Sequence, residues 1–193
     1  LATDMSENFL EVLKGKDLNV DVSLASVDII PLEDTSVGSV VCAQSFHWFS
    51  DEKYIKSIRR VLVPGGKLFL IWIKGDFDHE VMAHFIEWRK QLFMKLQGSL
   101  KYDINSMEWR KDIDVSPLFK LQWHKTLPGI RLQRDIETVL ANVTTSSLYK
   151  SLPPDEREAN LNHVRELIKN LPDIDINNIT VQYKIELYVY QAE

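Results

Sequence analysis

The 193-residue sequence contains a single cysteine, Cys42. One cysteine excludes an intrachain disulfide and any zinc site built from several cysteines. It lies in the apolar run 40–43, and a free cysteine in such a run is usually buried, so we expect Cys42 to be a core residue. No apolar run approaches the ~20 residues that span a bilayer, and no secretory leader is seen. The sequence therefore favours a cytoplasmic protein with no membrane partner.

Basic residues are neither abundant nor clustered. Lys and Arg number 23 against 28 Asp and Glu, which gives a formal net charge of −5. A nucleic-acid groove needs a basic footprint, so we expect no nucleic-acid partner. The histidines show no ligand spacing, because His79 and His84 are five residues apart and His124 and His163 are isolated, so we predict no metal site.

Apolar segments alternate with helical patterns along the first 75 residues. Strands are predicted at residues 1–4, 19–25, 37–43 and 67–73, and helices at residues 5–13 and 50–62. Strands that alternate with helices need crossover connections, which predicts a parallel sheet. The run 37–43 is nearly continuously apolar, as expected of a central strand buried on both faces.

The second half of the chain has a looser pattern. Helices are predicted at residues 77–96, 135–143 and 154–171, and strands at residues 118–126 and 179–190. A turn is predicted at Pro128-Gly129, and the last strand should lie antiparallel beside residues 118–126 in the same sheet. We therefore predict a single α/β domain over residues 1–193, with a helical or lid insertion at residues 75–117.

The first predicted strand ends at a carboxylate, Asp4, and passes directly into a helix. Nucleotide-binding α/β sheets hold a ribose in this way, with the acid about 20 residues after a glycine-rich loop. No such loop precedes Asp4. We therefore expect the sequence to be a fragment of a longer gene product that carries a first strand and a glycine loop, and to bind a nucleotide cofactor weakly by itself. A natural truncated form is the alternative.

Four motifs occur in order at regular separations. They are Ala2-Thr3-Asp4-Met5-Ser6, Ile30-Pro31-Leu32-Glu33-Asp34-Thr35-Ser36-Val37, Val41-Cys42-Ala43-Gln44-Ser45-Phe46-His47-Trp48-Phe49 and Arg60-Val61-Leu62-Val63-Pro64-Gly65-Gly66-Lys67-Leu68. This succession resembles the class I S-adenosylmethionine-dependent methyltransferases, in particular the small-molecule branch with an Ala-Gln-x-Phe-His-Trp-Phe signature. The resemblance is specific over residues 1–74 and rests on element order beyond them. It implies a Rossmann-like sheet, mostly parallel, with an antiparallel C-terminal strand.

The resemblance also implies a cofactor site for S-adenosylmethionine without a metal. The cofactor-binding residues would be Asp4, Met5, Ser26, Val27 and Gln44. Asp4 would accept both ribose hydroxyls and Met5 would pack against the adenine. Ser26 and Val27 would meet the far edge of the adenine, where the family often has an acid in place of Ser26; here Asp28 is nearby. Gln44 would lie near the methionine part of the cofactor.

His47 and Trp48 follow the third motif's strand, where the methyl acceptor should approach. His47 could deprotonate or orient the acceptor, or it could pack with its aromatic neighbours and satisfy a backbone carbonyl. Trp48 would form a wall of the acceptor pocket. Methyl transfer depends largely on alignment of acceptor and methyl group. The resemblance implies a small-molecule acceptor as the partner, and the aromatic residues within 85–124 suggest either an apolar, planar pocket or simply core.

Two other function classes remain open. A non-catalytic interaction module could have kept the sheet and lost cofactor binding, which the missing glycine loop would favour. A fragment of a nicotinamide-dependent dehydrogenase shares the strand-acid-helix start, but residues 46–49 and the terminal strand pair argue against it.

Overall fold

The strands form two separate sheets in the computed structural model, which describes residues 1–76, 79–97 and 105–193. A parallel pair joins β1 (Ala2–Asp4) to β2 (Val22–Leu24). The second sheet has the strand order β3-β4-β6-β5. Its members are β3 (Val37–Ala43), β4 (Leu62–Gly75), β5 (Phe119–Arg134) and β6 (Ile179–Ala192). The α/β class is therefore confirmed, and residues 1–25 share no ladder with β3.

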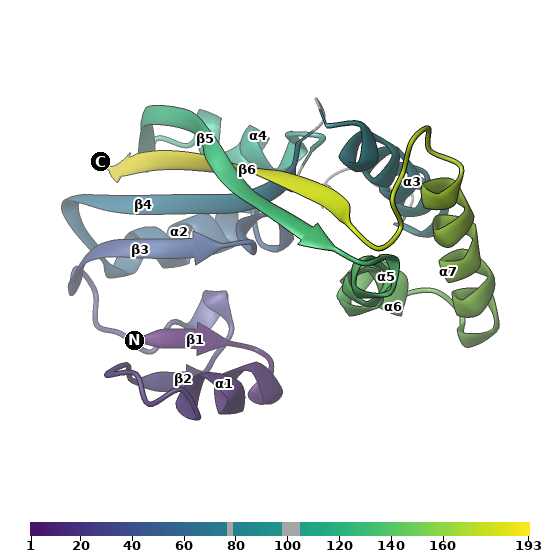
Figure 1. The fold of residues 1–193 in the computed structure, drawn as a ribbon. Coiled ribbons are helices and arrows are strands. Elements are labelled where there is room, and N and C mark those ends of the chain that lie inside the picture. Colours follow the sequence, from purple (N-terminus) through teal and green to yellow (C-terminus); the bar gives the residue numbers. More distant parts are fainter. Residues whose placement is uncertain (77–78, 98–104) are drawn as a thin grey trace. The chain divides into compact units, whose positions relative to one another are not determined.

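The larger sheet is mixed, as the sequence predicts. β3 and β4 are parallel, with Val40 paired to Leu68 and Ala43 paired to Ile71. β6 lies between β4 and β5 and runs in the opposite direction to both (Figure 1). The residue after β6 agrees with that direction, because the backbone N–H of Glu193 donates to the carbonyl of Leu118, just before β5 begins. The expectation of an antiparallel C-terminal strand beside residues 118–126 is confirmed.

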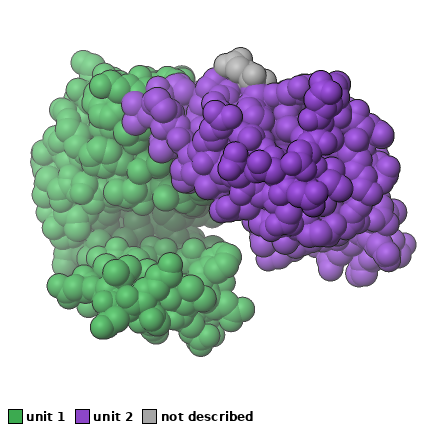
Figure 2. Space-filling view, in the orientation of Figure 1, with its two compact units in different colours: residues 1–71, 109–125, 187–193 green, residues 72–108, 126–186 purple. Residues whose placement is uncertain are grey.

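The described chain divides into two compact units, coloured separately in Figure 2. Unit 1 comprises residues 1–71, 109–125 and 187–193, and unit 2 comprises residues 72–108 and 126–186. The single domain over 1–193 with an insertion at 75–117 stays a prediction.

Unit 1 has a core built from one helix and the strands beside it. Its helical elements are α1 (Glu7–Lys14), η1 (Val27–Ile29), η2 (Phe46–Trp48), α2 (Glu52–Val61), η4 (Glu108–Arg110, from Trp109 on) and α4 (Lys111–Val115). In α2, Ile55, Ile58 and Val61 recur at helical spacing and are at most 1% exposed. Trp109 is 1% exposed and meets the rings of Phe46 and Tyr188 edge-to-face.

The prediction that residues 37–43 form a strand buried on both faces is wrong. In β3 only Cys42 is buried, and Val41 is 59% exposed. The physical reason is the position of the strand, because β3 is at the edge of its sheet and the face carrying Ser39, Val41 and Ala43 is uncovered by the described residues. The expected core position of Cys42 is confirmed at 6% exposure, and burial raises the pKa of its thiol to about 12.

Unit 2 is mainly helical. Its helices are α3 (Glu80–Gln97), α5 (Ile136–Thr145), α6 (Ser147–Lys150) and α7 (Pro154–Lys169), and their apolar faces form one core with Ile179 and Val181 of β6. These helices confirm the predictions at 77–96, 135–143 and 154–171, although residues 77–78 lie outside the described residues. α5 begins as the sequence indicates, because the Asp135 carboxylate accepts the backbone N–H of Thr138 at 2.9 Å.

The predicted turn at Pro128-Gly129 is also wrong, because β5 continues through both residues to Arg134. A Cβ added to Gly129 would lie 2.3 Å from the carbonyl oxygen of Tyr183 in β6. Glycine is therefore needed here because two backbones approach closely within the sheet. From the sequence alone, a glycine in this role cannot be told from a glycine in a turn. Across the described ranges, no helix is long and apolar enough to cross a bilayer.

Candidate functional site

The residues that the sequence predicts for a site follow the carboxyl ends of parallel strands in unit 1. Asp4 is the last residue of β1, and Ser26 follows β2 by two residues. The backbone N–H of Ala25 donates to the Asp4 carbonyl at 3.2 Å, so these two strand ends are adjacent. Gln44 directly follows β3, and in Figure 1 the arrows of β1 and β3 point the same way. Ligands of open α/β sheets bind at such strand ends.

Asp4 presents an exposed carboxylate. One of its oxygens, Oδ1, accepts the backbone N–H of Ser6 at 2.7 Å and so orders the entry into α1. The carboxylate has no other hydrogen bond with the described residues and can accept hydroxyl donors from a ligand. Met5 is 76% exposed beside it, an apolar side chain available to a planar group.

The Ser26 side chain is hydrogen-bonded to a neighbouring acid. Its hydroxyl donates to the carboxylate of Asp28, and this hydrogen bond is the main cause that lowers the pKa of Asp28. Asp28 is exposed and therefore ionised at neutral pH. Val27 is half-buried at the start of η1, so the segment offers an acid at position 28 beside an apolar contact at position 27.

Gln44 has a backbone conformation that residues other than glycine rarely adopt. Its φ is 56°, in the left-handed region, and its N–H donates to the carbonyl of Ile71 at 2.8 Å. Such strain costs of order 1–3 kcal/mol and clusters at ligand sites. The conformation turns the chain sharply from β3 into η2 and leaves Gln44 exposed at the strand end.

His47 and Trp48 are neighbours with opposite exposures. His47 is only 5% exposed, whereas Trp48 is 43% exposed, and their ring centroids are 4.9 Å apart. Burial of His47 in η2 agrees with the packing interpretation that the sequence left open. The indole of Trp48 is exposed at the surface, where a ligand can contact it. Within the three described ranges, no three His, Cys, Asp or Glu side chains gather as a metal site would need.

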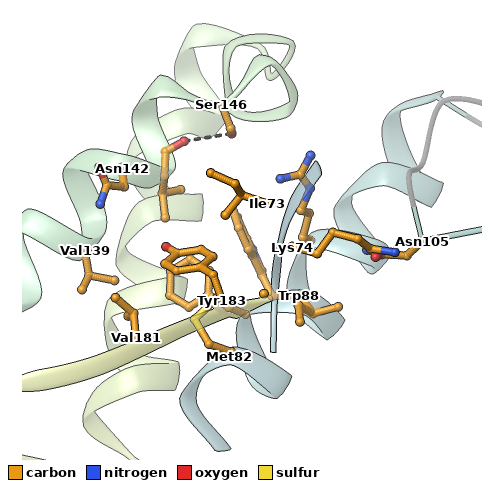
Figure 3. Close-up of a pocket in the computed structure, with 15 residues that line it drawn as sticks. Ile73, Lys74, Met82, Trp88, Asn105, Val139, Asn142, Ser146, Val181 and Tyr183 are labelled. Atoms are coloured by element: carbon orange, nitrogen blue, oxygen red, sulfur yellow. Dashed lines mark hydrogen bonds between the residues drawn. The ribbon is translucent and has the colours of Figure 1, made fainter. Parts of the chain in front are cut away.

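Unit 2 contains a cavity that sequence reasoning did not locate (Figure 3). It encloses about 190 Å³. It is lined by the end of β4, by α3, α5 and β6, and by two loop residues: Ile73, Lys74, Gly75, Met82, Phe85, Ile86, Trp88, Arg89, Asn105, Val139, Asn142, Val143, Ser146, Val181 and Tyr183. The aromatic side chains of α3 gave a hint, since Phe85 and Trp88 line this cavity.

Comparison with known proteins decides the family. A family model described as a methyltransferase domain matches residues 1–70. The chain is also 34% identical to an uncharacterized methyltransferase of Schizosaccharomyces pombe, over 96% of this chain and 73% of that protein. The chain belongs to the class I S-adenosylmethionine-dependent methyltransferase family. A second S. pombe protein, an uncharacterized methyltransferase-like protein, is 33% identical to this chain. The match covers 90% of this chain and 65% of the S. pombe protein. The chain thus spans about two thirds to three quarters of these relatives.

Solved structures show the same fold for this methyltransferase. A candidate type II methyltransferase from Anaeromyxobacter dehalogenans superposes with a TM-score of 0.65 at 17% identity, covering 97% of this chain and 77% of that chain. A loganic acid methyltransferase solved with SAH superposes with a TM-score of 0.59 at 11% identity, covering 99% of this chain and 73% of that chain. The sequence-based recognition of the family is confirmed.

Proposed function

We propose that this methyltransferase transfers a methyl group from S-adenosylmethionine to a small-molecule acceptor. The observation that carries the proposal is that Asp4, Ser26 and Gln44 stand at or just after the carboxyl ends of β1, β2 and β3 of unit 1. When bound, S-adenosylmethionine supplies a methyl group activated by its sulfonium. The residues present fit such a group, because they offer an exposed carboxylate, an exposed thioether and a strained strand end.

Each residue has a distinct role in this proposal. The Asp4 carboxylate accepts the ribose hydroxyls through the positions that Ser6 does not use. Met5 and Val27 contact the adenine, and the Ser26–Asp28 pair supplies the acid that accepts the adenine amino group. Gln44 binds the methionine end.

The acceptor is held and aligned by the segment after Gln44. Trp48 provides an exposed aromatic wall, and His47 is fixed next to it by burial. A fixed imidazole can orient an acceptor or take its proton, which contributes typically 10²–10⁴-fold to such reactions.

Calorimetry with S-adenosylmethionine tests the proposal, using the 193-residue chain and any longer form that its gene encodes. Asp4→Ala should weaken binding by about 1.5–3 kcal/mol, the scale of hydrogen bonds to a charged group. Asp21→Ala is the matched control, because Asp21 is an exposed acid just before β2, at the amino end of that strand. Equal affinities for the two variants, or no binding by any form of the protein, would contradict the proposal.

A further inference from the structure

The cavity of unit 2 has the size of a one-ring ligand. It encloses about 190 Å³, and an apolar cavity of about 150 Å³ is known to hold one benzene molecule. The last residues of β4, Ile73 to Gly75, line it, so it lies at the carboxyl end of a sheet strand. Phe85 and Trp88 of α3 contribute aromatic surface. A planar ring with a short substituent therefore fits the space.

Two neutral polar groups are available to a ligand there. The Tyr183 hydroxyl and the Asn142 side-chain amide form no hydrogen bond with the described residues, and both residues line the cavity. Figure 3 shows the Tyr183 ring projecting into it, with the hydroxyl toward the α5 side where Asn142 and Val139 lie. Burial raises the pKa of Tyr183, so its hydroxyl is protonated at neutral pH and can donate.

The charges around the cavity are of one sign. Lys74 and Arg89 line it, and no carboxylate is present among the described lining residues. Both cations also have other contacts within the protein. An anionic group on the ligand would meet two cationic side chains and no acid, whereas a cationic ligand would be repelled.

We propose that this cavity is a ligand site of unit 2, and that its ligand is a single-ring aromatic acid or an apolar acid of similar size, bound as its anion. The ring lies against Phe85, Trp88 and Tyr183, and the anion lies near Arg89 and Lys74.

Binding of four small probes, measured by calorimetry or ligand-observed NMR without cofactor, tests the ligand class. Benzoate should bind, benzamide should bind more weakly because it lacks the charge, and acetate and benzylammonium should show no saturable binding. Arg89→Gln should weaken benzoate binding about tenfold, the factor for about 1.4 kcal/mol. Lys90→Gln is the control, since Lys90 is an exposed cation next in α3 that does not line the cavity.

Val139→Phe should abolish benzoate binding because the larger side chain fills the cavity. If this variant fails to fold, Arg89→Gln still decides the question. Benzoate binding no tighter than acetate binding, or a wild-type affinity in Arg89→Gln, would overturn the inference. Cofactor binding with no benzoate binding would overturn this inference alone. Selective benzoate binding that Arg89→Gln weakens, in a protein that binds no S-adenosylmethionine, would support the ligand class and contradict the proposed function.

Discussion

The backbone N–H of Gln44 donates to the carbonyl of Ile71 at 2.8 Å, which ties the end of β3 to β4 while Gln44 holds a φ of 56°. The hydrogen bonding between the two strands thus extends one residue beyond β3, to a residue in the left-handed conformation that L-amino acids rarely adopt. The strand end that precedes η2, and with it Trp48, is therefore fixed by backbone geometry as well as by packing.

Substitutions of Gln44 should separate strain from side-chain function. Gln44→Val should be about 1–2 kcal/mol less stable than Gln44→Gly, because a β-branched residue tolerates the left-handed region worst and glycine adopts it freely. Urea denaturation provides the measurement. Both variants should weaken S-adenosylmethionine binding if the Gln44 side chain contacts it. Equal stabilities for Gly and Val would show that the left-handed conformation is not held in solution.

Cys42 should make stability fall at alkaline pH. Its thiol titrates near 9.0 when exposed and near 12 when buried, so the folded state holds the proton more tightly. Between these values the unfolded state binds fewer protons, and stability should decline by up to about 1.4 kcal/mol per pH unit. The measurement is the unfolding free energy against pH for wild type and Cys42→Ala, in which the difference between the two curves isolates the thiol. Parallel curves above pH 9 would contradict burial of Cys42.

His47 and Trp48 should differ in their kinetic signatures. If His47 aligns or deprotonates the acceptor, His47→Ala in the active enzyme should lower kcat about 10²-fold while cofactor affinity hardly changes. A purely structural role would instead lower the melting temperature, with activity following the folded fraction. Trp48→Ala should raise the acceptor KM more than it lowers kcat, because a pocket wall mostly supplies uniform binding.

Asp135 should stabilise α5 in a pH-dependent way. The pKa of its carboxyl is lowered mainly by the backbone N–H of Thr138 and then by the Thr138 hydroxyl. Because the folded pKa is the lower one, this contribution is present above the unfolded value of about 3.8 and is lost as pH falls through the folded pKa. Asp135→Ala should lower Tm at neutral pH, and Asp135→Asn, which can still cap, should lower it less. A Tm gap that persists in strong acid would exclude the ionised cap as its cause.

Local patterns predicted the elements well where one physical signal dominated. The helical spacing of Ile55, Ile58 and Val61 and the alternation of residues 179–190 correspond to α2 and β6. Sequence failed where the outcome depended on neighbours. An apolar strand is buried on both faces only if other elements cover both, and one face of β3 is uncovered by the described residues. Gly129 looks like a turn residue in the sequence, but in the structure it allows the backbone of β6 to approach closely.

The site was predicted unevenly for a related reason. Asp4, Ser26 and Gln44 stand at or next to strand ends in the sequence itself, so their placement follows from strand boundaries alone. The cavity is assembled from segments as distant as Lys74 and Tyr183, and no local period brings these together. Only the fold shows that Phe85 and Trp88 line a cavity whereas Trp109 is core.

The edge of β3 also has a consequence for this 193-residue chain at high concentration. Within the described residues β3 has a ladder partner only in β4, and the exposed Val41 adjoins the open side. An open edge with an apolar face is a template on which a strand of a second molecule can pair. Self-association should therefore begin at this strand, and a lysine at position 41 should delay it by placing a charge where an incoming strand would dock.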